Sequence, residues 1–298
     1  MIFRHLIIGY GKWGKTVAKN IQKSRQFKIS HIIKNRNSLN TLKLDGYQKL
    51  IDTAHVCSPI DSHYHYAKKL IFFKKNIIIE KPCFEYLYQI KSIINELKNK
   101  NNVILVNYIN LFNNALIYIK KKIIKENEVT SLKIIYSKFS KSYLNKYDCI
   151  KDWLDHPLSI SFFFLGSFNK FSINNFSSIK NKKNFFFENL NINFLYKKTD
   201  VSVYIRNSKK NENIRLIYLH TNKYYIEYDD TNKKLKIHNK INQKIKYISY
   251  KKDYPILNLY NNFYKKIIIN KKYNNLILAK KLMKKSTEII FAIKKIKN

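Results

Sequence analysis

Short apolar runs alternate with longer segments of helical periodicity over the first hundred residues. This alternation is typical of a parallel sheet whose strands are covered by helices. The expected helices span residues 12–24, 62–73 and 85–99. The expected strands span residues 3–8, 29–33, 55–57, 76–80 and 103–107.

The pattern changes after about residue 110. Helices are expected at 114–125 and 152–165, a strand at 131–139 and a closing helix at 276–296. Four further segments place apolar side chains at every second position, which predicts an antiparallel sheet with one buried face: 201–205, 214–218, 224–228 and 235–237. The "TNK" at 221–223 is a plausible hairpin turn. We therefore expect an α/β domain over 1–110 and an α+β domain over 111–298 with a large, mainly antiparallel, open-faced sheet.

The composition supports two packed domains and makes the glycines informative. An apolar fraction of 45% over 298 residues is normal for a globular protein. Lys, Asn, Ile, Phe and Tyr are abundant whereas Gly and Arg number only 5 each, a skew toward residues with A/T-rich codons. The few glycines that remain should therefore occupy positions where the backbone needs them.

The net charge of +39 raises the question of a nucleic-acid partner, because dense positive charge releases counterions from phosphate backbones. However, the lysines are spread along the chain, mostly as pairs, and no zinc-finger or RNA-recognition signature is present. We expect a solvated basic surface with weak, salt-sensitive adhesion to acidic polymers, and no specific nucleic-acid partner.

The cysteines and the apolar runs indicate the compartment. Cys57, Cys83 and Cys149 are widely spaced without a CxxC pair, so neither a disulfide framework nor a metal site is expected. The opening segment lacks a small-residue cleavage site, and no stretch approaches the roughly 18 to 20 apolar residues of a membrane span. We expect a cytoplasmic protein without a membrane partner.

Three of the five glycines form the pattern Gly9-x-Gly11-x-x-Gly14, directly after an expected strand and before an expected helix. The first allows a tight turn, the second lets a pyrophosphate approach the backbone, and the third lets helix and strand pack closely. The pyrophosphate would lie at the helix N-terminus, beside Lys12 and Trp13. This pattern predicts a Rossmann dinucleotide-binding domain; the alternative is a tight turn alone, with Trp13 serving only in packing.

The residues after the second strand bear on the choice of cofactor. NAD-binding domains usually place an Asp or Glu there, on the ribose 2′-hydroxyl. Here the segment "ISHIIKNRNS" places Lys34 and Arg36 at that point, and cationic groups suit the 2′-phosphate of NADP. NADP is therefore predicted in preference to NAD; the alternative is that these are ordinary surface cations.

Further segments carry a resemblance to a known family. "HVCSPIDSHYHYAKKLI" contains Ser58-Pro59 and His63, and "KKNIIIEKP" ends in Glu80-Lys81-Pro82. "DWLDHPLSISFFFLG" contains Asp152-x-x-x-His156, and "YPILNLYNNFYKKII" precedes the closing helix. In this order the motifs resemble those of the Gfo/Idh/MocA oxidoreductases over nearly the whole chain. The resemblance implies a Rossmann domain followed by a substrate domain.

The resemblance also implies roles for individual residues. Lys81, Asp152 and His156 would form the catalytic group around the substrate oxygen. Hydride transfer needs a proton donor or acceptor, which suits His156, and a group that steadies developing charge, which suits Lys81. Asp152 would lie one helical turn before His156, on the same face, and orient the imidazole or the substrate. The implied cofactor contacts are Ser58, Pro59, His63, Glu80 and Lys81, and Tyr108 would line the substrate cleft.

The expected function is an NAD(P)-dependent oxidoreductase acting on a CH–OH or ketone carbon of a sugar, nucleotide-sugar or cyclic polyol. The open face of the second sheet would be covered by another subunit, giving a homodimer or homotetramer. The bulky Trp153, Leu154 and Asp155 depart from the family's smaller residues and could narrow the pocket. The alternatives are a non-catalytic NADP-binding or sensor protein and, on charge alone, a nucleic-acid-binding protein.

Overall fold

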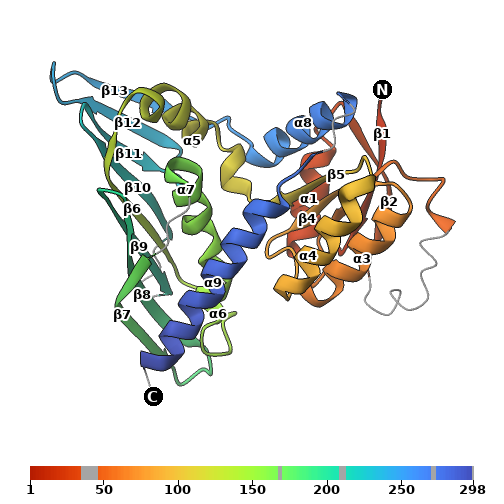
Figure 1. The fold of residues 1–298 in the computed structure, drawn as a ribbon, viewed down its shortest axis with the longest axis horizontal. Helices are drawn as coiled ribbons and strands as arrows, with labels where there is room; N and C mark the ends of the chain where they lie inside the picture. Colours follow the sequence, from red (N-terminus) through yellow and green to blue (C-terminus); the bar gives the residue numbers. More distant parts are fainter. Residues whose placement is uncertain (35–45, 167–169, 208–212, 270–272, 297–298) are drawn as a thin grey trace. The chain divides into compact units, whose positions relative to one another are not determined.

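The computed structural model describes residues 1–34, 46–166, 170–207, 213–269 and 273–296. Figure 1 traces the chain from one end to the other. Its contacts divide it into two compact units, the first made of Met1–Phe112 and Tyr254–Lys284, the second of Asn113–Asp253 and Lys285–Asn298. The expected division at 110 lies close to the break after Phe112. The structure differs from the expected single segment 111–298, because residues 254–284 return to the first unit.

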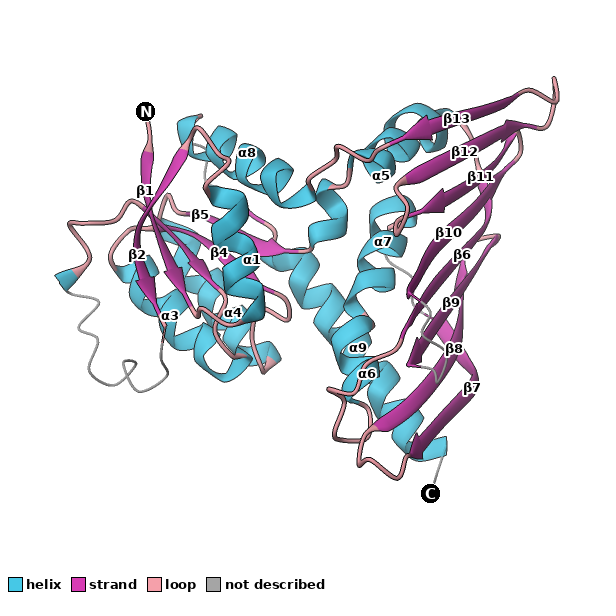
Figure 2. Cartoon of the chain, turned by 180° about the vertical axis from the view of Figure 1, so that it is seen from behind, coloured by secondary structure: helices cyan, strands magenta, loops and turns pink. Residues whose placement is uncertain are grey.

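Unit 1 is a six-stranded sheet in the order β14-β5-β4-β3-β1-β2, and all of its strand pairs are parallel. The strands are β1 Phe3–Ile8, β2 Phe27–Ile33, β3 Thr53–Val56, β4 Asn76–Glu80, β5 Val103–Asn107 and β14 Tyr273–Asn274. The helices are α1 Lys12–Ile21, α3 Ile60–Phe72, α4 Leu87–Glu96 and α8 Pro255–Ile268, seen in Figure 2 around the strands. The parallel sheet predicted for the first hundred residues is confirmed.

Unit 2 is an eight-stranded sheet in the order β13-β12-β11-β10-β6-β9-β8-β7. Neighbouring strands are antiparallel except β6 and β9, which are parallel. The strands are β6 Val129–Lys138, β7 Lys170–Lys180, β8 Phe186–Tyr196, β9 Thr199–Asn207, β10 Asn213–Thr221, β11 Tyr224–Asp229, β12 Lys234–Asn239 and β13 Ile245–Ser249. The mainly antiparallel sheet expected for the second half is confirmed, with a turn between β10 and β11 where "TNK" predicted it.

The helices of unit 2 lie on one face of this sheet, as Figure 1 shows. They are α5 Asn114–Tyr118, α6 Asp148–Trp153, α7 Asp155–Leu165 and the second part of α9 Leu276–Ile296. The helix expected at 114–125 is present as α5 followed by the turns Ile119–Ile123 and Ile124–Glu126. Among the described residues, no helix is both long enough and apolar enough to span a bilayer.

No strand is predicted from the sequence at the positions of β7, β8 or β13. In β8 the buried positions alternate as Glu188, Leu190, Ile192 and Phe194. Asparagines occupy the positions between them, and asparagine is depleted in strands. The alternation typical of a strand was therefore present, but the asparagines between the buried residues made a strand look unfavourable.

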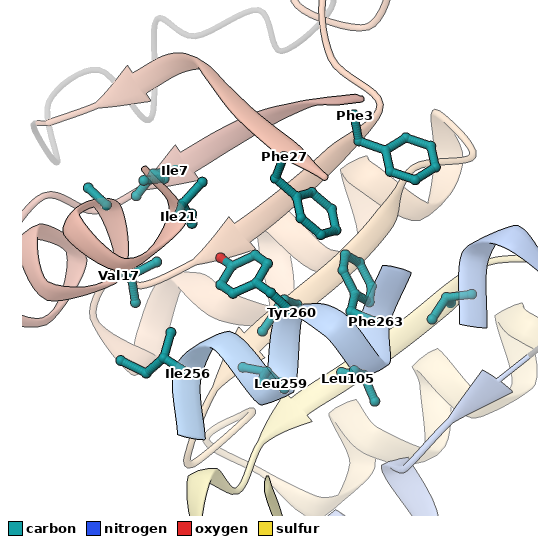
Figure 3. Packing of buried hydrophobic residues seen from close by; sticks show 13 residues of the cluster. Phe3, Ile7, Val17, Ile21, Phe27, Leu105, Ile256, Leu259, Tyr260 and Phe263 are labelled. Atoms are coloured by element: carbon teal, nitrogen blue, oxygen red, sulfur yellow. The ribbon is translucent and has the colours of Figure 1, made fainter. Parts of the chain in front are cut away.

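The core of unit 1 explains why the chain returns to it after residue 253. In Figure 3, the side chains of Tyr260 and Phe263 from α8 lie against Phe27 of β2. The ring centroids of Phe27 and Tyr260 are 5.2 Å apart, and those of Phe27 and Phe263 are 6.0 Å apart. Burial of such aromatic surface is strongly favourable, so α8 forms part of the first unit rather than the second.

A series of hydrogen bonds crosses this core through four fully buried residues. Thr53 Oγ1 lies 2.7 Å from His5 Nδ1, His5 Nε2 lies 3.1 Å from the Tyr260 hydroxyl, and that hydroxyl lies 2.7 Å from His55 Nδ1. Burial, aided by the nearby His55, lowers the pKa of His5 well below its usual value. A neutral His5 fits a series in which Thr53, His5 and Tyr260 each donate to the next group. Tyr260 thereby links β1, β3 and α8.

The Tyr260→Phe variant should lower the free energy of unfolding, because it leaves ring nitrogens of His5 and His55 buried without their partner. The loss should be about 1–3 kcal/mol. Urea unfolding followed by circular dichroism measures it, with Tyr88→Phe as the control, since Tyr88 is 63% exposed on α4. Equal unfolding midpoints for the two variants would contradict a structural role for the Tyr260 hydroxyl.

Candidate dinucleotide site and catalytic residues

The glycine-rich turn connects β1 to α1. Gly9 has a φ of +93°, and a Cβ there would lie 2.5 Å from the backbone nitrogen of Ser58. A Cβ on Gly14 would lie 2.0 Å from the carbonyl oxygen of Gly9. Gly11, by contrast, is exposed, and a Cβ there would meet nothing within 4 Å. Packing therefore requires glycine at positions 9 and 14, whereas the surroundings of Gly11 are open.

The N-terminus of α1 has the properties of an anion site. Gly11 is its N-cap, no side chain caps it, and its first turn contains no acidic residue. The first backbone N–H groups of a helix lack partners within the helix and carry the positive end of its dipole. Lys12 and Trp13 lie exposed in that first turn. The predicted fingerprint thus has the local geometry that a pyrophosphate requires.

The positively charged position after β2 is only partly described. Lys34 follows the last residue of the strand, is exposed, and places its Nζ 6.0 Å from the centroid of the Tyr10 ring. Arg36 lies outside the described residues. The preference for NADP therefore stays a prediction.

His63 holds together the two turns that follow β3 and β4. Its Nε2 lies 2.7 Å from the carbonyl oxygen of Ser58, and its Nδ1 lies 3.2 Å from the carbonyl oxygens of Pro82 and Cys83. The side chain is buried, and burial lowers its pKa although the carbonyl oxygens act in the opposite direction. Because both ring nitrogens face protein carbonyls, His63 supports the loop that carries Lys81. Its predicted contact with the cofactor stays a prediction.

Glu80 ends β4 and is hydrogen-bonded to residues of the two neighbouring strands. Its Oε1 lies 2.8 Å from His55 Nε2 and accepts a hydrogen bond of 2.7 Å from Asn107 Nδ2. Burial opposes ionisation of Glu80, but these hydrogen bonds outweigh it and hold the pKa below its usual value. Within the described part of the chain, Asn107 Oδ1 has no partner.

His55, Cys57 and Glu80 are the residues that could hold a metal ion in the described ranges. Their ligand atoms lie within 4.8 Å of one another. However, His55 and Glu80 are already bonded to each other, and burial raises the pKa of Cys57 well above its usual value. Metal binding requires the thiolate, which this environment disfavours. We therefore interpret His55 and Glu80 as part of the hydrogen-bonded network beside β4 and Cys57 as a neighbouring free thiol.

The other predicted residues of unit 1 lie at the same edge of the sheet. Ser58 and Pro59 form the turn after β3, where the Ser58 hydroxyl lies 2.6 Å from that of Ser62. Lys81 is half-buried and follows Glu80 directly. Tyr108 follows β5 and is only 3% exposed. Because the carboxyl ends of parallel strands meet at one edge, these residues and the glycine turn share the edge where Rossmann domains bind ligands.

Asp152 and His156 lie on two successive short helices of unit 2, which corrects the expected single helix at 152–165. Asp152 lies in the last turn of α6 and His156 in the first turn of α7, with the division at Leu154. Pro157 has no N–H to donate to the carbonyl of Trp153, which accounts for the break. Leu154 itself keeps helical dihedrals, φ −57° and ψ −36°.

Two tyrosines that the sequence did not single out contact this pair. The Tyr143 hydroxyl donates to Asp152 Oδ2 at 3.0 Å. The Tyr136 ring stacks on the His156 ring, with centroids 5.9 Å apart and planes at 9°. Asp152 is exposed and His156 is half-buried, so both keep access to solvent while a neighbour restrains them.

Glu188 is a third residue that sequence reasoning missed. It projects from β8 with 1% exposure and accepts hydrogen bonds from the backbone nitrogens of Tyr147, Cys149 and Ile150. A buried carboxylate thus caps α6, the helix that carries Asp152. The only sequence signal for Glu188 was a charged residue at a position where the alternation of β8 otherwise places apolar residues.

A comparison with protein families gives a match over the first unit. Residues 3–108 match the model of the Gfo/Idh/MocA family, described as an oxidoreductase family with an NAD-binding Rossmann fold. No curated protein matches the sequence at a significant level.

Solved structures match the fold of nearly the whole chain. UDP-N-acetylglucosamine 3-dehydrogenase from Acidithiobacillus ferrooxidans is 14% identical, with a TM-score of 0.82 and coverage of 97% of this chain and 96% of that one. An oxidoreductase from Agrobacterium radiobacter, in complex with NAD+, L-tartaric acid and magnesium, is 13% identical, with a TM-score of 0.76 and coverage of 95% and 93%. Biliverdin reductase from Synechocystis sp. PCC 6803, in complex with biliverdin and NADP+, is 14% identical, with a TM-score of 0.71 and coverage of 94% and 96%.

The fold and the glycine turn define the class of the first unit, which is a dinucleotide-binding Rossmann domain of an oxidoreductase. Residues 3–108 match the Gfo/Idh/MocA family, so the resemblance predicted from the motifs is confirmed over these residues. Over the rest of the chain, the solved structures show the same fold.

Substitution of Gly14 should mainly affect folding, whereas substitution of Gly11 should mainly affect dinucleotide binding. Gly14→Ala should destabilise the protein by several kcal/mol, about 3 or more, because a Cβ cannot fit 2.0 Å from the Gly9 carbonyl oxygen. Gly11→Ala should keep the unfolding free energy within about 1 kcal/mol and weaken dinucleotide binding, because its Cβ occupies the open space beside the helix N-terminus. Urea unfolding and cofactor titration by calorimetry measure the two effects. Unchanged affinity in Gly11→Ala would count against pyrophosphate binding at this turn.

Proposed function

We propose that this protein is an NAD(P)-dependent oxidoreductase that transfers a hydride between the nicotinamide and a CH–OH or ketone carbon of a sugar, nucleotide-sugar or cyclic polyol. The observation that carries the proposal is the glycine turn, with open backbone at Gly11 beside an uncapped helix N-terminus. The family match over residues 3–108 supports it. The substrate class is supported by the fold shared with a UDP-N-acetylglucosamine dehydrogenase.

The dinucleotide would be held by the residues at the carboxyl edge of the first sheet, and when bound it would supply the hydride acceptor or donor. Gly9, Gly11 and Gly14, with Lys12 and Trp13, would surround the pyrophosphate. Lys34 and Arg36 would contact the 2′-phosphate of NADP, the preferred cofactor. Ser58 and Pro59 would contact the remaining half of the dinucleotide.

Three residues would carry the chemistry on the substrate. In the oxidation direction, His156 takes the proton of the substrate hydroxyl as the carbon gives up its hydride, and returns it in the reverse direction. The Lys81 ammonium donates a hydrogen bond to the oxygen and steadies its developing charge. Asp152, held by the Tyr143 hydroxyl, orients the imidazole or the substrate.

We also propose that the protein is a cytoplasmic homodimer or homotetramer. Within unit 2 the described helices cover one face of the sheet, and a second subunit would cover the other. Light scattering of the purified protein tests this, and a stable monomer would contradict it. The cytoplasmic location is supported by three cysteines in the thiol form, two of them buried.

The cofactor preference predicts tighter binding of NADP than of NAD at matched salt. Lys34→Glu should reverse the order, because a carboxylate repels the 2′-phosphate and can accept from a ribose hydroxyl. Fluorescence titration with both oxidised cofactors at two salt concentrations measures it, with Lys28→Glu as a control for general charge. Tighter binding of NAD by the unaltered protein would overturn the NADP assignment.

The catalytic assignment predicts that Lys81→Ala and His156→Ala each lower the turnover rate by about 100-fold or more while dinucleotide affinity is largely kept. Oxidisable sugars, nucleotide-sugars and cyclic polyols are screened first with both cofactors, by the absorbance of reduced nicotinamide. Lys91→Ala and His65→Ala, at exposed positions, are the controls. Dinucleotide binding without turnover of any such compound would favour the non-catalytic sensor instead.

A further inference from the structure

Arg215 of β10 lies beside the two helices that carry Asp152 and His156. Its guanidinium carbon is 5.7 Å from the centre of the Trp153 ring, at the end of α6. Arg215 is also the register partner of Tyr136 of β6, whose ring stacks on that of His156. The guanidinium therefore belongs to the same part of unit 2 as the proposed proton acceptor.

Trp153 is the common neighbour of Arg215 and His156. The centroids of the Trp153 and His156 rings are 6.5 Å apart, with the ring planes at 77°. The indole Nε1–H donates to the Tyr143 hydroxyl at 2.5 Å, and that hydroxyl donates to Asp152. Trp153 is buried, so packing and this hydrogen bond together fix its ring. The bulky residue between Asp152 and His156 thus places an arginine next to the pair.

The guanidinium of Arg215 has hydrogen-bonding capacity that the described part of the chain does not use. An arginine carries five N–H donors. Within the described ranges its one ion pair joins Nη1 to Asp230 Oδ2 at 3.8 Å, which is longer than a hydrogen bond. The Nε atom is buried without a partner, whereas the side chain as a whole is 38% exposed. Unbonded donors are therefore carried by a side chain that solvent reaches.

Asp230 does not need Arg215 as a structural partner. Its Oδ1 accepts from Lys233 Nζ at 2.5 Å, from Asn113 Nδ2 at 2.9 Å and from the Tyr228 hydroxyl at 3.0 Å. Lys233 thus supplies a cation much closer to this carboxylate than Arg215 does. The charge of Asp230 is met by other groups, and the attraction at 3.8 Å leaves the guanidinium loosely held.

We propose that Arg215 binds an anionic group of the substrate, a phosphate or a carboxylate, while the reacting carbon lies at His156. A planar guanidinium donates two parallel hydrogen bonds to either group, which a lysine cannot do. Arg215 is one of only five arginines in a chain rich in lysine. The inference rests on the proposed function and narrows it. It selects nucleotide-sugars, or sugars that carry a carboxylate, over neutral sugars and cyclic polyols.

Binding is tested by calorimetric titration with UDP-glucose, glucuronate and glucose, which carry a diphosphate, a carboxylate and no charge. A second series contains reduced dinucleotide, which cannot accept a hydride and so permits no oxidation of the sugar. Arg215→Gln should weaken binding of an anionic compound by about tenfold or more, the loss of charged hydrogen bonds. Glucose binding should not change. Arg206→Gln is the matched control, an exposed arginine of β9.

The two anionic compounds distinguish the sources of the charge. Weaker binding of UDP-glucose alone assigns a phosphate, weaker binding of glucuronate alone assigns a carboxylate, and weaker binding of both supports recognition of either group. Equal affinities of Arg215→Gln and Arg206→Gln for both compounds would overturn the proposal. Failure of the unaltered protein to bind either compound, with or without dinucleotide, would overturn it as well.

Arg215→Lys guards against misfolding of the glutamine variant, because it keeps a cation near Trp153 and Asp230. It should still bind the anionic compound more weakly than the unaltered protein, since an ammonium lacks the planar fork. Circular dichroism establishes whether each variant is folded. If Arg215→Gln does not fold, unaltered affinity in Arg215→Lys would overturn the proposal.

The proposed function and this inference fail separately. With a substrate found by turnover, Arg215→Gln should raise KM by about tenfold or more and keep kcat within about twofold, because the anionic group is bound equally in the ground and transition states. Turnover of a neutral sugar that does not respond to Arg215→Gln would keep the proposed function and overturn the inference. Binding of an anionic compound through Arg215 without turnover would keep the inference and favour the non-catalytic sensor.

Discussion

The contact between two glycines at the start of α1 is the constraint on which the first unit depends. A Cβ on Gly14 would lie 2.0 Å from the carbonyl oxygen of Gly9, and a Cβ on Gly9 would lie 2.5 Å from the backbone of Ser58. The helix, the turn and the loop after β3 therefore meet backbone to backbone. This close approach sets the N-terminus of α1 at the carboxyl edge of the sheet. A larger residue at either position would move the helix away from this edge.

The polar network beneath this edge gives the core a specific arrangement. Apolar contacts alone tolerate exchange of similar side chains, whereas a series of buried hydrogen bonds has few satisfactory arrangements. Tyr260 lies between His5 and His55, and both histidines are fully buried. The network therefore specifies how α8 lies on the sheet, and it ends at the carboxylate of Glu80. The packing of α8 in the core is thus linked through His55 to the end of β4.

The helices that carry Asp152 and His156 show a different way to place functional groups. The buried carboxylate of Glu188 caps α6 from a neighbouring strand, and Pro157 separates α6 from α7. Asp155, between the two predicted catalytic residues, is buried and accepts a hydrogen bond of 2.7 Å from Ser286 of α9. Its charge therefore serves structure, whereas Asp152 remains exposed. Asp152 and Asp155 are three positions apart, and their surroundings leave only Asp152 accessible to a substrate.

The sequence by itself determined the features that depend on local conformation. The strands at 3–8, 76–80 and 103–107, the closing helix at 276–296 and the glycine turn were all predictable, because periodicity and backbone conformation are properties of neighbouring residues. Only the tertiary structure decided that α8 joins the first unit, that Tyr260 bonds to a histidine 205 residues away, and that Glu188 caps α6. Such contacts join residues whose side chains look ordinary in isolation, and their partners are chosen by packing over the whole chain. The candidate site was thus predictable at the backbone of the glycine turn and not in side chains such as Tyr143 and Glu188, which contact or support Asp152 and its helix.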